Sequence, residues 1–376
     1  MADVIVKGDT SGAVTLSAPA VAGTVTVTLP STSGTMLTTA SSTGISGSAI
    51  SSGTVAEAYG GTGTSTGYYG FKNRIINGAM GISQRTAVNT NVAVTTTVSG
   101  TFGPDRFTGY SGTASLWNIL QVTTGVYDFP YALRLQRIAG QTSTSAIYLR
   151  QVIETNNCID LAGQTVTLSF YATAGANYSG GAVTTQIYTG TASDQGTASL
   201  NSGTWTGFVS PIASTFTPTT TRTRFSFTAT LGSTVQEVAF GLNWSGSGTA
   251  GANDYLDITG VQVEKGSTAT SFDYRPYGTE LLLCQRYYTQ EINTGLGGES
   301  CFSGNVTNTA PYYANTTFKV TMRAIPTVTL TNHTNLQFSA TAGTAYPQVS
   351  GFVESRLANA TGTGYFFSTW VATAEL

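Results

Sequence analysis

Apolar and polar residues alternate along many short runs of this chain. Val166, Leu168 and Phe170 are separated by threonine and serine, and residues 225–229 repeat the pattern with phenylalanine and alanine. A period of two predicts β-strands that turn one face toward a core. Such runs recur roughly every 10–20 residues between glycine or asparagine turns, without helix-period runs of comparable length. We therefore predict an antiparallel β-sandwich of jelly-roll type over residues 71–277.

A slip in the alternation predicts a β-bulge at Gly260. Leu256 and Ile258 alternate with polar residues, and Val261 and Val263 resume the alternation one residue out of step. One extra residue at a glycine redirects the apolar face without ending the strand. We expect this segment to be the closing strand of the large domain.

A second, smaller β-domain is predicted after a boundary near Gly278. Pro276 cannot continue a sheet ladder, so the strand region ends before it. Residues 278–292 are the only plausible helical piece, and they could equally form the first strand of the next domain. The alternating runs that predict a small β-sandwich over residues 278–376 are 318–322, 328–330, 336–338 and 365–374.

The first 40 residues contain two alternating runs that are too short to bury a core alone. Their apolar positions are Val14, Leu16, Val25, Val27 and Leu29. An arm of this kind, residues 1–40, is expected to become ordered by pairing with other copies or by docking into a partner assembly.

Residues 41–70 form a stretch rich in glycine, serine and threonine. Ile45, Ile50 and Val55 recur every five residues within it. Several parallel copies could bury that stripe along a common axis, which predicts a short stalk in an elongated homotrimer. A flexible linker is the alternative.

Composition excludes several classes of function. Only 9% of residues are charged and the net charge is −2, which leaves no electrostatic footprint for nucleic acid. We interpret the small basic group of Lys72, Arg74 and Arg85 as a solvated or interface surface. No run of 18 apolar residues predicts a membrane span, and the N-terminus lacks the apolar core of a secretory signal. We expect synthesis in a cytoplasm without general secretion.

The three cysteines have no metal-ligand spacing. Cys158, Cys284 and Cys301 are expected to be buried free thiols, and a late disulfide between Cys284 and Cys301 is the alternative.

Catalytic patterns are missing from the sequence, so we predict no catalytic residues, no cofactor and no metal. The single histidine, His333, lies between two strand patterns and is expected to be a turn residue. Asp254 and Asp257 are a close acidic pair, but three positions apart on a strand they do not face each other, as a glycosidase would require. We expect Asp254 and Asp257 to be a turn residue and a surface residue. The alternative is a structural calcium ion held by Asp257 and a carbonyl near Asn77.

Aromatic faces and short polar side chains are what sugar recognition needs. The candidate ligand-binding residues are Trp117, Trp205, Trp244, Tyr312, Tyr313 and Trp370. Core or inter-domain packing is an open alternative for each tryptophan. Tyr312 and Tyr313 are placed in a predicted loop and have better prospects of exposure.

Several longer motifs resemble tail-fibre and related virion proteins of aquatic tailed bacteriophages. They are GFKNRIINGAMGISQR (70–85), GPDRF (103–107), YALRLQRIAG (131–140), LAGQTVTLSFYA (161–172), residues 253–288 and FFSTWVATAEL (366–376). Residues 6–37 are similar to N-terminal virion-attachment segments, and GGTG (60–63) resembles a motif at the end of fibre shafts. The order of NGAM, LAGQTVTLSFYA and DYLDITGVQVE is also similar to jelly-roll carbohydrate-binding modules.

The resemblance implies a non-enzymatic tail fibre of the virion. Its arm (Val14, Leu16, Val25, Val27 and Leu29) would attach to tail or baseplate proteins, and residues 278–376 would be a receptor-binding tip for a host surface glycan or protein. The alternatives are a capsid decoration or head-fibre protein, and a tailspike that depolymerises polysaccharide.

Overall fold

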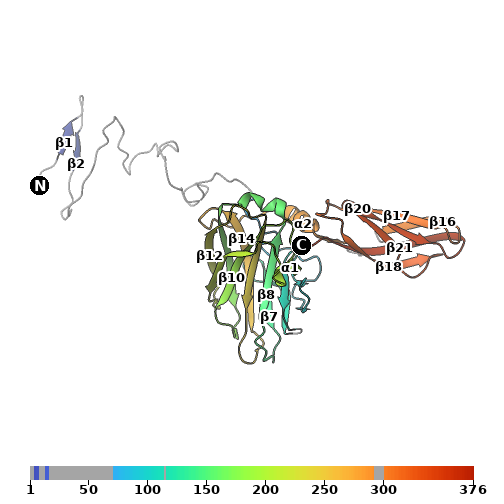
Figure 1. The fold of residues 1–376 in the computed structure, drawn as a ribbon, viewed down its shortest axis with the longest axis horizontal. Coiled ribbons are helices and arrows are strands. Elements are labelled where there is room, and N and C mark those ends of the chain that lie inside the picture. Colours follow the sequence, from blue (N-terminus) through green and yellow to red (C-terminus); the bar gives the residue numbers. More distant parts are fainter. Residues whose placement is uncertain (1–3, 8–12, 17–70, 114–115, 292–299) are drawn as a thin grey trace. The chain divides into compact units, whose positions relative to one another are not determined.

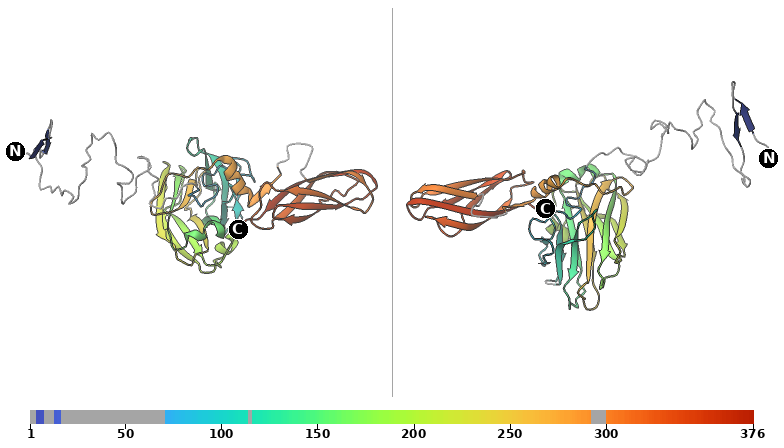
Figure 2. Two further views of the ribbon diagram at one scale, coloured as in Figure 1. Left: turned by 90° about the horizontal axis from the view of Figure 1, so that it is seen from above. Right: turned by 180° about the vertical axis from the view of Figure 1, so that it is seen from behind.

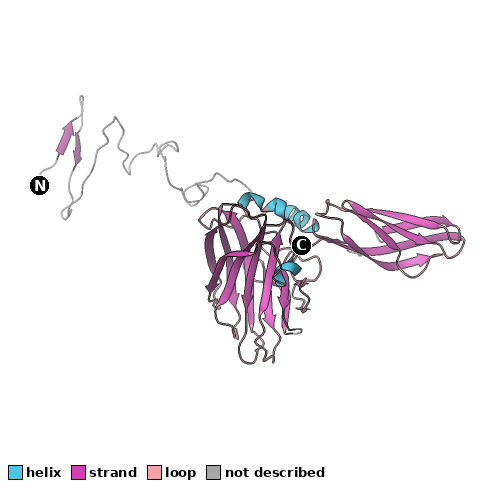
Figure 3. Ribbon diagram, viewed as in Figure 1, coloured by secondary structure: helices cyan, strands magenta, loops and turns pink. Residues whose placement is uncertain are grey.

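The computed structural model describes residues 4–7, 13–16, 71–113, 116–291 and 300–376. Its chain divides into two compact units, Met1–Gly53 and Thr54–Leu376, and each is described by itself. Strands dominate and the described helices are short (Figures 1 and 3), so the protein is all-β.

The described residues of the first unit, 4–7 and 13–16, form an antiparallel strand pair. β1 (Val4–Lys7) and β2 (Ala13–Leu16) pair with Val4 opposite Leu16. The predicted strand at Val14 and Leu16 is confirmed. Val25, Val27, Leu29 and the predicted stalk lie outside the described residues, so attachment, stalk and trimer stay predictions.

The second unit begins with a sandwich of two six-stranded sheets whose pairs are all antiparallel (Figures 1 and 2). The first sheet has the order β11-β10-β13-β8-β5-β4, with β4 (Thr101–Phe102), β5 (Thr108–Ser111), β8 (Ile147–Ile153), β10 (Val183–Gly190), β11 (Val209–Phe216) and β13 (Glu237–Trp244). The second has the order β12-β9-β14-β7-β6-β3, with β3 (Val92–Ala93), β6 (Trp117–Thr123), β7 (Tyr131–Arg137), β9 (Thr165–Ala174), β12 (Thr223–Thr230) and β14 (Tyr255–Lys265).

The inner faces of these two sheets form one hydrophobic core. Val166, Leu168 and Phe170 of β9 are fully buried in it, as their alternation predicts. Trp117 and Trp244 meet there edge to face, with ring centroids 4.6 Å apart. This burial stabilises the sandwich through the removal of apolar surface from water.

The predicted bulge in β14 is confirmed. The pairing of β14 with β9 shifts register between Thr259 and Gln262, and Gly260 has a φ of +60°. A Cβ atom at Gly260 would lie 2.8 Å from Phe129 Cζ, so both the backbone and the space favour glycine. The strand ends at Lys265, ten residues before the arginine that precedes Pro276.

Residues after Pro276 form a helix and then two smaller sheets. The helix α2 (Tyr277–Gln285) precedes β15 (Tyr288–Gln290), so the segment 278–292 contains both of the expected elements. One sheet contains β15, β16 (Ser300–Val306), β18 (Thr327–Leu336) and β21 (Gly362–Thr373), and the other contains β17 (Pro311–Thr317), β19 (Thr344–Gln348) and β20 (Gly351–Leu357). The boundary near Gly278 stays a prediction.

Three expectations about local structure are wrong. Residues 318–322 lie in a connecting segment instead of a strand, and Met322 is buried from that segment. His333 lies within β18, at a shift of its register with β21, instead of in a turn. Residues 278–292 are not the only helical piece: α1 (Thr197–Asn201), η3 (Thr155–Asn157) and η4 (Ile159–Leu161) lie elsewhere, and they have too few turns to show a helical period.

Candidate functional site

The outer face of the first sheet carries tyrosines and one arginine. In β8, Ile147 and Leu149 point into the core, so the alternation turns Tyr148 and Arg150 outward. The register places Tyr110 of β5 opposite Tyr148. On the other side of β8, Arg150 lies opposite Gly241 of β13.

These strands and the β10–β11 connection enclose a pocket of about 370 Å³. Its lining residues are Tyr110, Gly112, Ser145, Ala146, Tyr148, Arg150, Leu200 and Asn201. Leu200 and Asn201 belong to α1, which lies against β8 in Figure 1. This volume is within the range of small-molecule sites.

Aromatic rings define the sides of the pocket. The Tyr110 and Tyr148 centroids are 5.9 Å apart, and both side chains are partly buried. The Arg150 guanidinium lies 5.2 Å from the Tyr148 ring centroid and 4.7 Å from that of Tyr188. Such cation–π contacts hold the guanidinium in place between the two rings.

Gly241 allows this close arrangement. A Cβ atom there would lie 2.3 Å from Tyr188 Cε2 and 2.6 Å from Arg150 Nη1. Any side chain at Gly241 would displace the ring or the guanidinium, so glycine here is a packing requirement of the site.

Two polar atoms at the pocket have no hydrogen-bond partner. Among the described residues, Arg150 Nε has no acceptor and Asn201 Oδ1 has no donor. The Asn201 amide is held by its Nδ2, which donates to the Val98 carbonyl at 2.8 Å. Burial lowers the pKa of Arg150 and raises the pKa of Tyr188. The site therefore offers aromatic faces, a donor and an acceptor to a bound molecule.

An apolar cluster continues from one side of the pocket. Val152, Tyr188, Leu200, Trp205 and Ala239 are buried together there, with Leu376 packed against them. The Trp205 Nε1 donates to the Gly196 carbonyl at 3.0 Å. Trp205 thus supports α1 and its loop from beneath.

The other tryptophans named from the sequence also pack inside. Trp117 and Trp244 are in the sandwich core, and Trp370 is in the core of the C-terminal sheets. All four indoles are 4% exposed or less, as the alternative of core packing expects. Their role in ligand binding stays a prediction.

The two tyrosines of the C-terminal sheets lie on a strand instead of the expected loop. Both belong to β17, where alternation separates them. Tyr312 packs edge to face on Phe338 at 5.7 Å, while Tyr313 is 56% exposed. Only Tyr313 has the exposure that binding would need.

Asp254 and Asp257, the acidic pair considered for calcium binding, each pair with an arginine in the structure. Asp254 is fully buried and pairs with Arg137 at 2.9 Å, which corrects the expectation of a simple turn residue. Asp257 accepts two hydrogen bonds from Arg134, at 2.7 and 2.8 Å, so its oxygens already have a cation partner. In the described part of the chain, no three His, Cys, Asp or Glu side chains group as a metal site requires.

The cysteines are free thiols in the structure. Cys158 and Cys284 are buried, whereas Cys301 is exposed on β16, contrary to the expected burial. Burial raises the pKa of Cys158 to about 12 and that of Cys284 well above its ordinary value. Both buried thiols are therefore protonated and unreactive at neutral pH.

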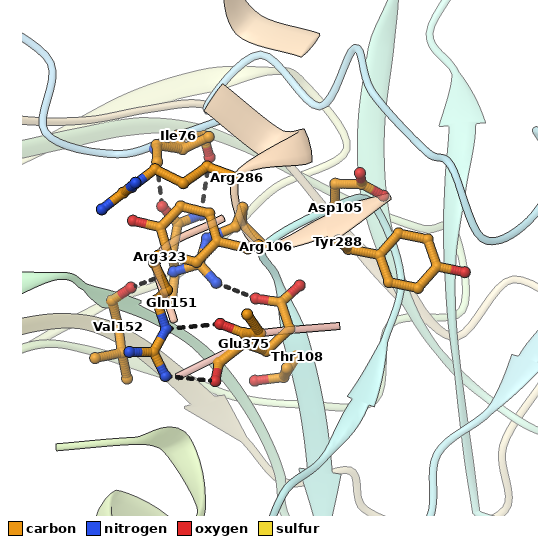
Figure 4. Close-up of polar contacts among 12 residues, drawn as sticks. Ile76, Asp105, Arg106, Thr108, Gln151, Val152, Arg286, Tyr288, Arg323 and Glu375 are labelled. Carbon is orange, nitrogen blue, oxygen red and sulfur yellow. Dashed lines mark hydrogen bonds and ion pairs between the residues drawn. The ribbon is translucent and has the colours of Figure 1, made fainter. Parts of the chain in front are cut away.

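A second polar region joins the sandwich to the end of β21. We call Arg85, Arg106, Arg323 and Glu375 the junction cluster; Figure 4 labels Arg106, Arg323 and Glu375. The Glu375 carboxylate pairs with Arg106 and, at 2.8 Å, with Arg85, while Arg323 donates to the Glu375 carbonyl at 2.9 Å. Arg106 also donates to the Val152 carbonyl at 2.7 Å. Asp105, 3.6 Å from Arg85, and Asp194, 3.6 Å from Arg323, supply further acidic partners, so each arginine of the cluster lies beside a carboxylate of the chain.

Another pocket, of about 460 Å³, lies beside the 71–82 segment and is lined in part by Tyr131, Phe272 and Tyr274. The Arg275 guanidinium there already pairs with a carboxylate, since it donates to Glu280 at 3.1 Å, although its Nε has no partner among the described residues. This pocket therefore differs from the first in that its arginine has an acidic partner.

The sequence analysis did not find Tyr110, Tyr148, Arg150, Tyr188 and Asn201. The signal that could have found part of the set is residues 147–153, IYLRQVI, where tyrosine and arginine take the outward positions of a strand. The other members come from strands and a helix that only the fold brings together.

A scan against protein-family models and a search of curated proteins both find no match. Among solved structures, the chain is similar to a CBM4 structure at 19% identity, over 50% of this chain and 98% of that one, with a TM-score of 0.29. It is similar to the enzymatically active domain of bacteriophage CBA120 tailspike protein 4 at 14% identity, over 52% of this chain and 22% of that one, with a TM-score of 0.29.

A third similarity is to the C-terminal family 22 carbohydrate binding module of Clostridium thermocellum Xyn10B. The identity is 10%, over 44% of this chain and 89% of that one, with a TM-score of 0.30. Among the described residues, no helix combines the length and apolar content that a membrane crossing requires.

Proposed function

We propose that this chain is a non-enzymatic protein that binds a cell-surface glycan in the pocket of the first sheet. The observation that carries the proposal is the joint placement of aromatic rings and unpartnered polar atoms. Tyr110 and Tyr148 offer faces for a sugar ring, and Asn201 and Arg150 offer hydrogen-bonding atoms for its hydroxyls. None of the pocket's described lining residues is a carboxylate, which favours binding over glycoside hydrolysis at this site.

Replacement of Tyr148 tests the proposal. We expect Tyr148→Ala to weaken binding by about 10-fold or more, because the ring face at the middle of the pocket is lost. A glycan array with the full chain selects the ligand, and calorimetry measures the affinity. Tyr127→Ala is the control, since Tyr127 is fully exposed on a loop outside the pocket.

Unchanged affinity in Tyr148→Ala would rule out this pocket as the glycan site. If Tyr313→Ala weakened binding instead, the site would lie on the C-terminal sheets, as the sequence suggested.

We further propose that the protein is a homotrimeric phage tail fibre, made in the host cytoplasm and attached to the virion through residues 1–40. The resemblance of its motifs to virion proteins supports this proposal. Several weak sites on one trimer could exceed the affinity of one site by about 10²–10⁴-fold. The mass in solution of the full chain and of a chain that begins at Phe71 tests it. A trimer that becomes a monomer on truncation is the expected result.

Two monomers would contradict the trimeric stalk. Labelled antibodies in electron micrographs of the particle would then distinguish the tail from the capsid. Finding the protein on the capsid would favour the decoration alternative.

A further inference from the structure

The Arg150 guanidinium is a buried charge that pairs with no carboxylate in the part of the chain that the structure describes. Arg150 is 6% exposed, and its Nη1 makes a single hydrogen bond, at 3.3 Å, to the Leu149 carbonyl. Among the described residues, the other buried arginines, Arg106, Arg137 and Arg356, each pair with an acidic side chain. Only tyrosines, Tyr148 and Tyr188, lie close enough to affect the charge of Arg150.

An unpaired buried cation destabilises a folded protein, so it needs a reason. Burial lowers the pKa of Arg150, but a guanidinium keeps its proton at neutral pH. The charge therefore cannot be removed by deprotonation, as it could be at a lysine. The two tyrosine rings compensate it in part, and an anion that enters the pocket would complete the compensation.

The surroundings of Arg150 fit one kind of anion. A guanidinium presents a planar fork that matches a carboxylate through two parallel hydrogen bonds. The same pocket offers the ring faces of Tyr110 and Tyr148, 5.9 Å apart, and the unpartnered Asn201 Oδ1 as an acceptor. An inorganic anion would use the fork alone, whereas an acidic sugar would use all three features.

We infer that the pocket binds an acidic sugar, such as a uronic acid within a surface polysaccharide. Its carboxylate pairs with the Arg150 guanidinium, its ring lies against Tyr148, and a hydroxyl donates to Asn201. This inference rests on the proposed glycan-binding function and adds the chemical class of the ligand.

The experiment compares acidic and neutral oligosaccharides on the full chain. Trigalacturonic acid and galactotriose are titrated by calorimetry into the unaltered protein, Arg150→Gln, Arg150→Lys and Arg134→Gln. Arg134 is the matched control. Its guanidinium lies 3.5 Å from the Tyr255 ring centroid, as Arg150 lies over tyrosine rings, but it belongs to the second sheet and already pairs with Asp257.

We expect the unaltered protein and Arg134→Gln to bind the acidic trimer about 10- to 100-fold more tightly than the neutral one. Arg150→Gln should bring that ratio close to one, and Arg150→Lys should keep a smaller preference, since lysine retains the charge without the fork. Near-ultraviolet circular dichroism checks that each variant is folded.

Three results would overturn the inference. Equal binding of both trimers by the unaltered protein, with both weakened by Tyr148→Ala, would leave the proposed function standing and reject acidic selectivity. Displacement of the acidic trimer by an equal concentration of inorganic phosphate would show a simple anion site. Binding of no oligosaccharide on a broad array would reject both the inference and the proposed function.

Discussion

Arg106 and Arg150 occupy similar surroundings in two regions of the same sandwich. Both are buried, and each guanidinium lies over a tyrosine ring, Arg106 at 3.6 Å from the Tyr287 centroid and Arg150 at 4.7 Å from that of Tyr188. In the junction cluster, Arg106 also pairs with Glu375. At the pocket, Arg150 has one long hydrogen bond to a carbonyl.

The difference separates a structural arginine from a binding one. A buried ion pair whose members satisfy each other needs nothing from outside the chain, and it fixes two parts of the fold together. A buried cation without an acidic partner lowers the stability of the fold but can pair with an anionic ligand, as is common at binding sites. The two regions should therefore respond in opposite ways when a charge is removed.

The largest effect is expected at the junction cluster. Glu375→Gln should lower the free energy of unfolding by about 3 kcal/mol, because it leaves Arg85 and Arg106 without their shared carboxylate. Urea denaturation of the full chain measures the change. The buried Cys284 thiol, which packs beside Tyr287, gives a second readout: its labelling by a maleimide should become faster in the variant.

Asp160→Asn is the control for this prediction. It removes the ion pair between Asp160 and Arg74. The Asp160 side chain is 39% exposed, so the loss of unfolding free energy should stay below about 1 kcal/mol. A loss of similar size in both variants would mean that the junction charges are no more important than a surface pair.

A buried carboxyl group, Glu237, sharpens the comparison, because it can become neutral by binding a proton whereas arginine stays charged. Burial raises the pKa of Glu237 to about 8, although Thr155 donates a hydrogen bond to it at 2.8 Å. The folded protein therefore keeps a proton on Glu237 that the unfolded chain releases near pH 4.5. The folded state binds more protons between these values, so stability falls as the pH rises from about 4.5 to about 8.

Glu237→Gln should remove this loss. We expect the difference in unfolding free energy between pH 5 and pH 8 to shrink by about 1–3 kcal/mol in the variant, measured by urea denaturation at both values. Glu154→Gln is the control: the Arg286 pair contributes to a lowered pKa of Glu154, so its contribution is lost only as the pH falls below about 4.5. A Glu237→Gln protein with unchanged pH dependence would show that Glu237 is ionised when folded.

Local patterns predicted the elements of this fold, but not the contacts between them. The buried face of β9 and the bulge at Gly260 follow from a period of two and one glycine, which are properties of neighbouring residues. The pocket instead combines Tyr110, Tyr148 and Asn201 from three distant segments, and the sheet order that unites them is not written in any one of them.

The tryptophans also show that residue chemistry alone does not predict a binding site. Trp117 and Trp244 were candidates for sugar binding because of their chemistry, yet the two indoles pack against each other in the core. The alternation of a strand identifies its apolar face, but it does not say whether an indole on that face packs in the core or lines a pocket. The junction also depends on pairing between Arg106 and Glu375, which are 269 positions apart.

The smallest expected effect has the opposite sign to that at the junction. Arg150→Gln should raise the free energy of unfolding by about 1 kcal/mol in the absence of ligand, because it removes an uncompensated charge and leaves Tyr148 and Tyr188 in place. The same urea titration measures it, and added trigalacturonic acid should stabilise the unaltered protein more than Arg150→Gln. A loss of stability in Arg150→Gln would mean that the guanidinium is held for packing between the two rings, and the contrast with Arg106 would disappear.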